Sequence, residues 1–334
     1  KDGYYGIEGD KSSGDAIRAN IEDGILREIF RGAKEAQIVG NFGLTQKAVL
    51  SAAIALDDPV DTPAMIDWVY ADSSVQANFE RGETYNTGGD INSMLVSGLY
   101  RDGQNLESPS YNEMGISDLL DGAVALERYA KNHNIGDNQP ILSHPKYLAL
   151  INSFLPLNIG RKGIPGLADA GTAASYTEWP GTSYLITAFH SLKDSKDEGV
   201  QAEVVKIAQQ LYKRNVSGSN YGIWAEDPTS LYQDVLDYIG TYGEYDWDKS
   251  TIMTGYGYAF LRAGTLYDTV GATGIRDTQR DFMLNFSGHN LHNHADMLDI
   301  QFTSYGVPFT YDFGYAEFMV TGDPHSSQLT ATTI

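Results

Sequence analysis

The densest group of residues that could do chemistry is a histidine segment near the end of the chain. His289, His292 and His294 lie within six positions of one another in Gly288–Asp296, and the whole chain has only seven histidines. In a strand, His292 and His294 would point to the same face of the sheet. Two imidazoles on one face can share a metal ion, or one can bind metal while the other contacts a substrate. A solvated polar loop is the alternative interpretation of this pattern.

A carboxylate follows the histidines at a spacing that suits a metal site. Asp312 lies in the turn-like segment Tyr311–Tyr315, after a strand-like stretch that would return the chain toward the histidines. Histidine and carboxylate are common zinc ligands, and His325 could supply a third. The sequence therefore favours a zinc site that includes Asp312 and one or both of His292 and His294, with a further ligand that His325 could supply. Its expected role is structural, because it would orient the strand that presents His292.

A second group of polar residues forms the segment Asp102–Asn112, which we expect in a loop between two helices. Tyr111 directly follows a Ser-Pro-Ser sequence, and we expect a rigid turn there. The alternative role for Tyr111 is packing, which is the more common role of a single tyrosine. Asp102 and Glu107 have the alternative role of capping and bracing the loop.

Two further polar residues stand out. Asn41 precedes a predicted helix at Leu44, where it could cap the helix or donate a hydrogen bond into a cleft. Arg262 could stabilise a nearby anion or ionised tyrosine, or it could form a surface or domain-interface ion pair.

These residues fall on elements of two kinds. Ile17, Ile21, Ile25 and Ile29 lie at helical spacing within Ala16–Ala36. Further amphipathic stretches begin near Leu44, Ala64, Ile91, Ile116, Lys146, Gln201 and Leu231. After about Asp248 the segments become strand-like: Thr251–Leu261, Asp281–Phe286, Met297–Ser304 and Val307–Tyr311, with a hairpin turn at Gly306–Pro308. We predict a multidomain α+β protein. Its helical domain over 1–245 would be an α/α toroid, complete or incomplete. The start of an antiparallel β-sandwich follows over 246–334.

Composition limits the class of protein. A chain of 334 residues, 42% hydrophobic and without a long apolar run, suits two globular domains without membrane insertion. The absence of cysteine excludes disulfides and thiolate metal sites. A net charge of −21 argues against a nucleic-acid partner. It also counts against an anionic substrate, unless the cleft is locally basic. The 22 tyrosines suit stacking on sugars or ordinary packing.

The chain ends also carry information. The sequence starts at Lys1 rather than Met and stops at the strand-like Thr332-Thr333-Ile334. We therefore expect more protein beyond both ends and a secreted or periplasmic location of the bacterial type.

Taken in order, the Asn41 segment, the Asp102–Asn112 loop and the His292–Tyr315 region resemble the heparinase II/III-like polysaccharide lyases, which include heparin and alginate lyases. The resemblance implies an N-terminal toroid and a C-terminal sandwich. It implies that Tyr111 is the Brønsted acid, and in some members also the base. By the same resemblance Asn41 contacts the uronate carboxyl, His292 is the active-site histidine, and His294 with Asp312 binds zinc. Phe42, Asn112 and Ser326-Ser327 replace residues that many members have at these places.

The function that this resemblance implies is cleavage of an acidic, uronate-containing polysaccharide by β-elimination, which leaves a 4,5-unsaturated uronate end. We assign substrate contacts to Glu107, Asn112, Arg262 and Tyr315, and expect Tyr111, Asn41 and His292 to meet in one cleft. One alternative is a glycoside hydrolase on a helical toroid, which needs two facing carboxylates from candidates such as Asp102, Glu107 and Asp169. The other alternative is a non-catalytic carbohydrate-binding protein.

Overall fold

The computed structural model describes residues 11–38, 40–78, 83–133, 140–159, 164, 180–213, 230–245, 249–264, 279–287, 298–305 and 307–310. The chain forms two compact units. The first unit consists of Lys1–Val96 with Asp121–Pro140, and the second of Ser97–Leu120 with Ile141–Ile334. This division follows packing, whereas the predicted boundary near residue 245 follows the change from helices to strands. That boundary stays a prediction.

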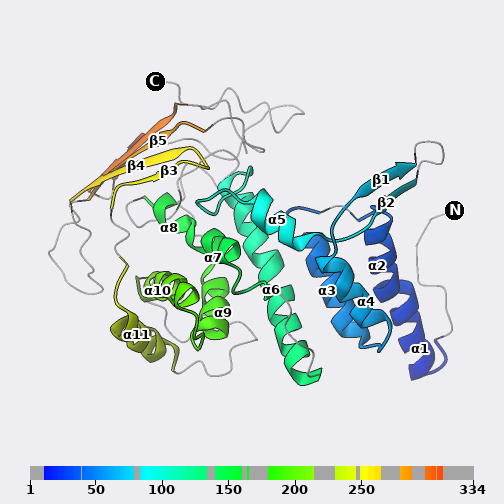
Figure 1. The fold of residues 1–334 in the computed structure, drawn as a ribbon. Helices are drawn as coiled ribbons and strands as arrows, with labels where there is room; N and C mark the ends of the chain where they lie inside the picture. Colours follow the sequence, from blue (N-terminus) through cyan, green and yellow to red (C-terminus); the bar gives the residue numbers. More distant parts are fainter. Residues whose placement is uncertain are drawn as a thin grey trace. The chain divides into compact units, whose positions relative to one another are not determined.

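Helices precede a strand-rich region, as expected (Figure 1). The helices are α1 (Gly14–Ile21), the π-helical η1 (Glu22–Leu26), α2 (Arg27–Lys34), α3 (Leu44–Leu56), α4 (Asp61–Tyr70), α5 (Ile91–Gly98), α6 (Pro109–His133), α7 (Pro145–Asn152), α8 (Phe154–Leu157), α9 (Thr182–Leu192), α10 (Glu198–Lys213) and α11 (Leu231–Tyr242). The strands are β1 (Val75–Asn78), β2 (Glu83–Asn86), β3 (Thr251–Met253), β4 (Tyr258–Ala263), β5 (Arg280–Asn285), β6 (Ile300–Ser304) and β7 (Val307–Thr310).

The first helical stretch of the first unit is continuous but not uniform. The Ser13 hydroxyl accepts a hydrogen bond from the Ala16 N–H at 3.1 Å and thereby caps α1. The single π-helical segment η1 then joins α1 to α2. Ile17, Ile21 and Ile25, which lie at helical spacing, are 45%, 43% and 40% exposed.

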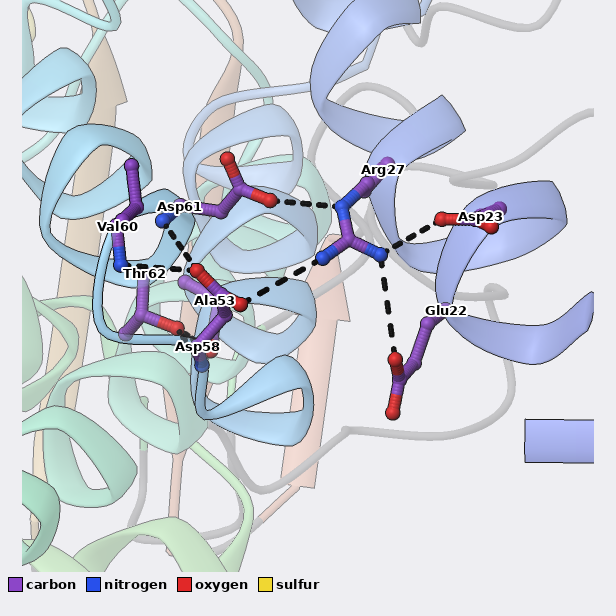
Figure 2. Close-up of polar contacts among 8 residues, drawn as sticks. All are labelled: Glu22, Asp23, Arg27, Ala53, Asp58, Val60, Asp61 and Thr62. Carbon is purple, nitrogen blue, oxygen red and sulfur yellow. Dashed lines mark hydrogen bonds and ion pairs between the residues drawn. The ribbon is translucent and has the colours of Figure 1, made fainter. Parts of the chain in front are cut away.

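Arg27 connects this first stretch to the turn before α4 (Figure 2). Its guanidinium lies within 2.7 Å of a carboxylate oxygen of both Asp23 and Asp61. Glu22 and Asp58 lie farther away, at 4.0 and 3.8 Å. The first unit also contains a β1–β2 hairpin, so the part of the chain predicted as helical is not wholly helical.

The second unit packs its helices around a large apolar core. Helix α10 contacts α7, α9 and α11, and the fully buried Phe154 and Phe189 lie in the elements α8 and α9. The Tyr147 hydroxyl donates to the Ile116 carbonyl at 2.7 Å, which joins α7 to the first part of α6. A closed toroid stays a prediction.

The five-stranded sheet of the second unit is antiparallel throughout and follows the chain in the order β3-β4-β5-β6-β7 (Figure 1). One face is buried and includes Tyr258, Phe260 and Met283. The other face is also apolar, yet Leu261 and Phe309 on it are 56% and 64% exposed. Apolar side chains on both faces are typical of a sheet covered on both sides. The sandwich stays a prediction, because a second sheet packed on this one is not seen among the described residues.

Candidate functional site

The predicted site loop connects α5 to α6 in the second unit. Pro109 is the first residue of α6, where a missing backbone N–H costs no helical hydrogen bond. Tyr111 therefore lies in the first turn of α6 rather than in the rigid loop turn that we expected. Its side chain is half-buried. The Asn112 N–H donates to the Ser108 carbonyl at 3.0 Å, which extends the helix back to the loop.

Asn112 shapes the loop that precedes it. Its side chain is 0% exposed. The amide oxygen accepts from the Asn105 N–H at 3.0 Å, and the amide nitrogen donates to the Glu107 carbonyl at 2.8 Å. These two hydrogen bonds give Asn112 a structural role, and its predicted contact with substrate stays a prediction.

Other contacts fix the loop on helix α7. Lys146 donates from Nζ to the Leu99 and Tyr100 carbonyls at 2.7 and 3.0 Å. Gly103 has φ +92°, and a Cβ there would lie 2.1 Å from the Ala149 carbonyl oxygen. Only glycine fits this close backbone approach, so the loop has little freedom to shift.

Asp102 and Tyr256 join the loop to the turn between β3 and β4. Asp102 Oδ2 accepts hydrogen bonds from the backbone N–H groups of Gly255 and Tyr256 at 2.7 and 3.1 Å. In the opposite direction, the Tyr256 hydroxyl donates to the Glu107 carbonyl at 2.9 Å. The bracing role that we held open for Asp102 is therefore the one seen in the structure.

The same turn contacts the end of β5. The Phe286 N–H donates to the Gly257 carbonyl at 2.7 Å. Gly257 has φ +91°, and a Cβ on it would lie 2.3 Å from Ser287 Cα. Ser287 is the last described residue before the histidine segment. The segment thus starts beside a turn that is bound to the Tyr111 loop.

The histidine segment also ends at this place. The Leu298 N–H donates to the Asn285 carbonyl at 2.7 Å, and the Asn285 N–H donates to the Asp299 carbonyl at 2.9 Å. Ser287 and Leu298, the described residues on either side of 288–297, therefore both lie at the end of β5, next to the β3–β4 turn. His292 and His294 themselves lie outside the described residues, as do Asp312, Tyr315 and His325.

Arg262 on β4 is buried in structural contacts. Its side chain is 2% exposed, and Nε lies 3.3 Å from Asp281 Oδ1 on the neighbouring strand β5. The guanidinium also donates to the backbone carbonyls of Lys249, Pro156 and Asn158 at 3.2, 2.5 and 2.8 Å. These contacts favour the ion-pair alternative over a substrate contact, although the pair is buried rather than at the surface.

Asn41 lies in the first unit, in an exposed turn before α3. Its backbone carbonyl accepts from the Leu44 N–H at 3.0 Å. The N-cap residue of α3 is Gly43, with φ +86°, so Asn41 does not occupy the capping position we considered. Whether Asn41 meets Tyr111 stays a prediction, because the two residues belong to different units.

Glu113 is a candidate that the sequence did not single out. It lies two residues after Tyr111, and its Oε1 accepts from the Gly181 N–H at 3.4 Å. Burial raises the pKa of its carboxyl, and the charge of Asp118 raises that pKa further, whereas the Gly181 hydrogen bond lowers it. A raised pKa is a property of many proton-transfer groups, but positions two apart on a helix do not face each other, so Glu113 and Tyr111 lie on different sides of α6. No motif marks it in the sequence.

Zinc binding stays a prediction, because all three expected ligands lie outside the described residues. Within the described ranges, no group of three or more histidine or acidic side chains could hold a metal ion. None of the described helices combines the length and apolar character needed to cross a membrane.

Comparisons with known proteins give a distant structural likeness only. No family model and no curated protein matches the chain. Two solved structures of a heparinase III, one with methylated lysines, match with TM-scores of 0.47 and 0.46 at 13% identity. Each match covers 85% of this chain and 34% of the heparinase III. The chain therefore spans about a third of the length of those proteins.

Proposed function

We propose that the chain is part of a secreted or periplasmic polysaccharide lyase that cleaves a uronate-containing polymer by β-elimination. The proposal is supported by the places of described residues in the second unit. The Asp102–Asn112 loop, with Tyr111 at its end, is bound to the β3–β4 turn. Ser287 and Leu298, the described residues before and after the histidine segment, lie beside the same turn.

Chain reach supports a shared site for Tyr111 and His292. His292 is five residues after Ser287, and an extended chain spans at most about 3.3–3.6 Å per residue. His292 therefore lies within about 18 Å of Ser287. Tyr111 is four residues after Glu107, whose carbonyl accepts from Tyr256 in the β3–β4 turn. Both residues are therefore near enough to this turn along the chain to reach a single cleft.

The proposed chemistry follows from the acidity of a uronate. The C5 proton lies α to a carboxylate, and hydrogen bonds that neutralise this carboxylate stabilise the enolate-like intermediate. The amide of Asn41 is proposed for this role. A base removes the C5 proton, a C4=C5 double bond forms, and an acid protonates the departing O4. Tyr111 is the proposed acid, and it can act as base if a positive group such as His292 lowers its pKa from about 10.

Zinc has a structural part in this proposal. His294, Asp312 and His325 would hold the ion, which would fix the orientation of the strand that carries His292. None of the proton transfers depends on the metal.

A panel of acidic polysaccharides tests the proposal, with new absorbance from the C4=C5 double bond as the readout. On a cleaved polymer, Tyr111→Phe should lower turnover about 10²–10⁴-fold with little change in binding. The matched control is Tyr129→Phe, which removes an exposed hydroxyl that donates to Asp57 at 2.7 Å. A Tyr111→Phe enzyme as fast as the control would overturn the role of Tyr111.

A glycoside hydrolase is the second candidate, and the raised pKa of Glu113 is the observation in its favour. A hydrolase needs a protonated carboxylic acid beside the scissile bond. New reducing ends without new absorbance would support it, and Glu113→Gln should then abolish turnover. Binding of the polymer without any turnover would instead support a carbohydrate-binding protein.

A further inference from the structure

Asp102 is the residue through which the loop that carries Tyr111 contacts the sheet most directly. Its Oδ2 accepts from two consecutive backbone N–H groups, those of Gly255 and Tyr256. A carboxylate that accepts backbone N–H bonds makes stronger hydrogen bonds than a neutral acceptor. The contact joins positions that are 153 and 154 residues apart in the chain, so it is a tertiary contact and not a local turn.

The residues around Asp102 restrict the position of the Gly255–Tyr256 turn. A Cβ on Gly255 would lie 2.7 Å from Tyr100 Cβ and 3.1 Å from both carboxylate oxygens of Asp102. Tyr256 is 1% exposed, and its ring stacks on that of Tyr258 at a centroid distance of 4.8 Å. The backbone of the turn therefore contacts the loop directly, and a glycine is needed for this approach.

From these contacts we infer that Asp102 is a positioning residue, with Tyr256 as its partner. Together they hold Ser287, the described residue before the histidine segment, at a fixed place relative to the loop that carries Tyr111. The catalytic part of this inference rests on the proposed lyase function, because it supposes that Tyr111 and His292 act on one substrate. The geometric part does not.

The geometric part can be measured without any activity. The chain has no cysteine, so Leu106→Cys and Leu298→Cys introduce two unique sites for spin labels. Both side chains are exposed, at 41% and 70%, and they report on the loop and on the exit of the histidine segment. We expect a narrow distribution of distances between the labels in the otherwise unchanged chain. Asp102→Ala should broaden it.

A matched control comes from the same unit. Asp197 Oδ1 accepts from the Val200 N–H at 2.9 Å at the start of α10. Asp197→Ala removes a backbone-accepting carboxylate far along the chain from the loop, so it should lower stability without changing the distances between the labels. If Asp102→Ala leaves the distribution as narrow as Asp197→Ala does, the inference is wrong.

Turnover on a cleaved polymer then tests the catalytic part. Asp102→Ala should lower kcat about tenfold or more, because a misplacement of about 1 Å can cost 10²-fold, while KM changes less than kcat. Asp102→Asn should restore most of the rate, since an amide oxygen can still accept both N–H bonds. Tyr256→Phe should give a smaller loss. If Asp102→Asn is as slow as Asp102→Ala, the carboxylate itself is needed for chemistry and positioning is overturned.

The two proposals fail in different ways. If no polymer is cleaved, the lyase proposal fails, and the label distances alone decide whether Asp102 positions the segment. If polymers are cleaved and Asp102→Ala broadens the distances while kcat stays unchanged, the lyase proposal and the geometric part of the inference stand, and its catalytic part is rejected.

Discussion

Arg27 in the first unit and Arg262 in the second each connect separate segments, and they do so in opposite surroundings. Arg27 is 34% exposed and lies within 4.0 Å of four carboxylates, those of Glu22, Asp23, Asp58 and Asp61 (Figure 2). Arg262 is 2% exposed, and among the described residues it lies near the Asp281 carboxylate. It also donates to the backbone carbonyls of Lys249, Pro156 and Asn158.

The difference indicates that burial, rather than the number of partners, determines how much an ion pair contributes to the free energy of unfolding. Water and salt screen exposed pairs, so most of them contribute little. Loss of one member of a buried pair leaves an uncompensated charge in a medium that solvates it poorly. Arg262 also lies on β4, the strand that follows the Tyr256 turn. This buried charge contact thus lies in the sheet whose β3–β4 turn is bound to the Tyr111 loop.

Arg262→Met should have the largest effect on stability. It leaves the Asp281 carboxylate, 1% exposed, without its positive partner, and we expect a loss of about 3–5 kcal/mol in the free energy of unfolding of the second unit. Urea unfolding monitored by tryptophan fluorescence gives the measurement. Arg280→Met is the control, since Arg280 is exposed and donates to the Tyr305 hydroxyl at 2.8 Å. Equal losses in the two variants would contradict the argument from burial.

The sequence predicted much of the strand region because its local signals agree. Alternation and β-branched residues placed the strands that became β5, β6 and β7 within a few residues of their bounds. The β1–β2 hairpin was not predicted, because Val75–Asn78 and Glu83–Asn86 are mostly polar. Helix α9 was also missed. Gly181 precedes it and provides no side-chain cap, so the usual start signal is absent.

The candidate site was predictable only where side-chain types carry the signal. Tyr111 and the histidine segment stand out by composition. The contact between Asp102 and the Gly255–Tyr256 turn could not be predicted, because its donors are backbone N–H groups that every non-proline residue has. The hydrogen-bond partners of Arg262 could not be predicted for the same reason, since three of them are backbone carbonyls. Glu113 differs from other glutamates only in its burial.

A second change should reverse part of the Arg262 loss. If the loss of the positive charge beside the buried Asp281 carboxylate causes the instability, Asp281→Asn in the Arg262→Met background should recover about 1–2 kcal/mol, because a neutral amide is easier to bury. The Gln279 amide, which donates to Asp281 Oδ1 at 2.9 Å, can still donate to the asparagine oxygen. The same urea experiment measures the recovery. A double variant less stable than Arg262→Met would assign the loss to packing and carbonyl contacts instead.

Asp58, one of the four carboxylates near Arg27, should contribute less to stability than Arg262 does, and its contribution should depend on pH. Its Oδ1 accepts from the Val60 and Asp61 N–H groups at 2.8 and 2.9 Å. These hydrogen bonds, chiefly that from Asp61, lower the pKa of its carboxyl. A lowered folded pKa stabilises the protein above the unfolded value of about 3.9, and this contribution is lost as the pH falls through the folded pKa. Asp58→Ala should therefore lower the Tm at pH 6, and the difference from wild type should shrink below pH 4. A difference that is constant from pH 6 to pH 2 would show that ionisation has no part in it.

Arg27→Met should have the smallest effect on stability, and we expect that effect to depend on the salt concentration. The substitution removes the positive charge among four carboxylates, so the first unit loses attraction and gains repulsion between like charges. Both terms act across solvent, where the Debye length falls from about 10 Å at 0.1 M salt to about 3 Å at 1 M. The loss in Tm should be clear at 0.02 M salt and nearly absent at 1 M. Arg262→Met should keep its loss at both concentrations, because water and ions do not reach its partner. If the two variants respond to salt alike, exposure does not separate the two arginines, and the number of carboxylates becomes the better explanation of their weight.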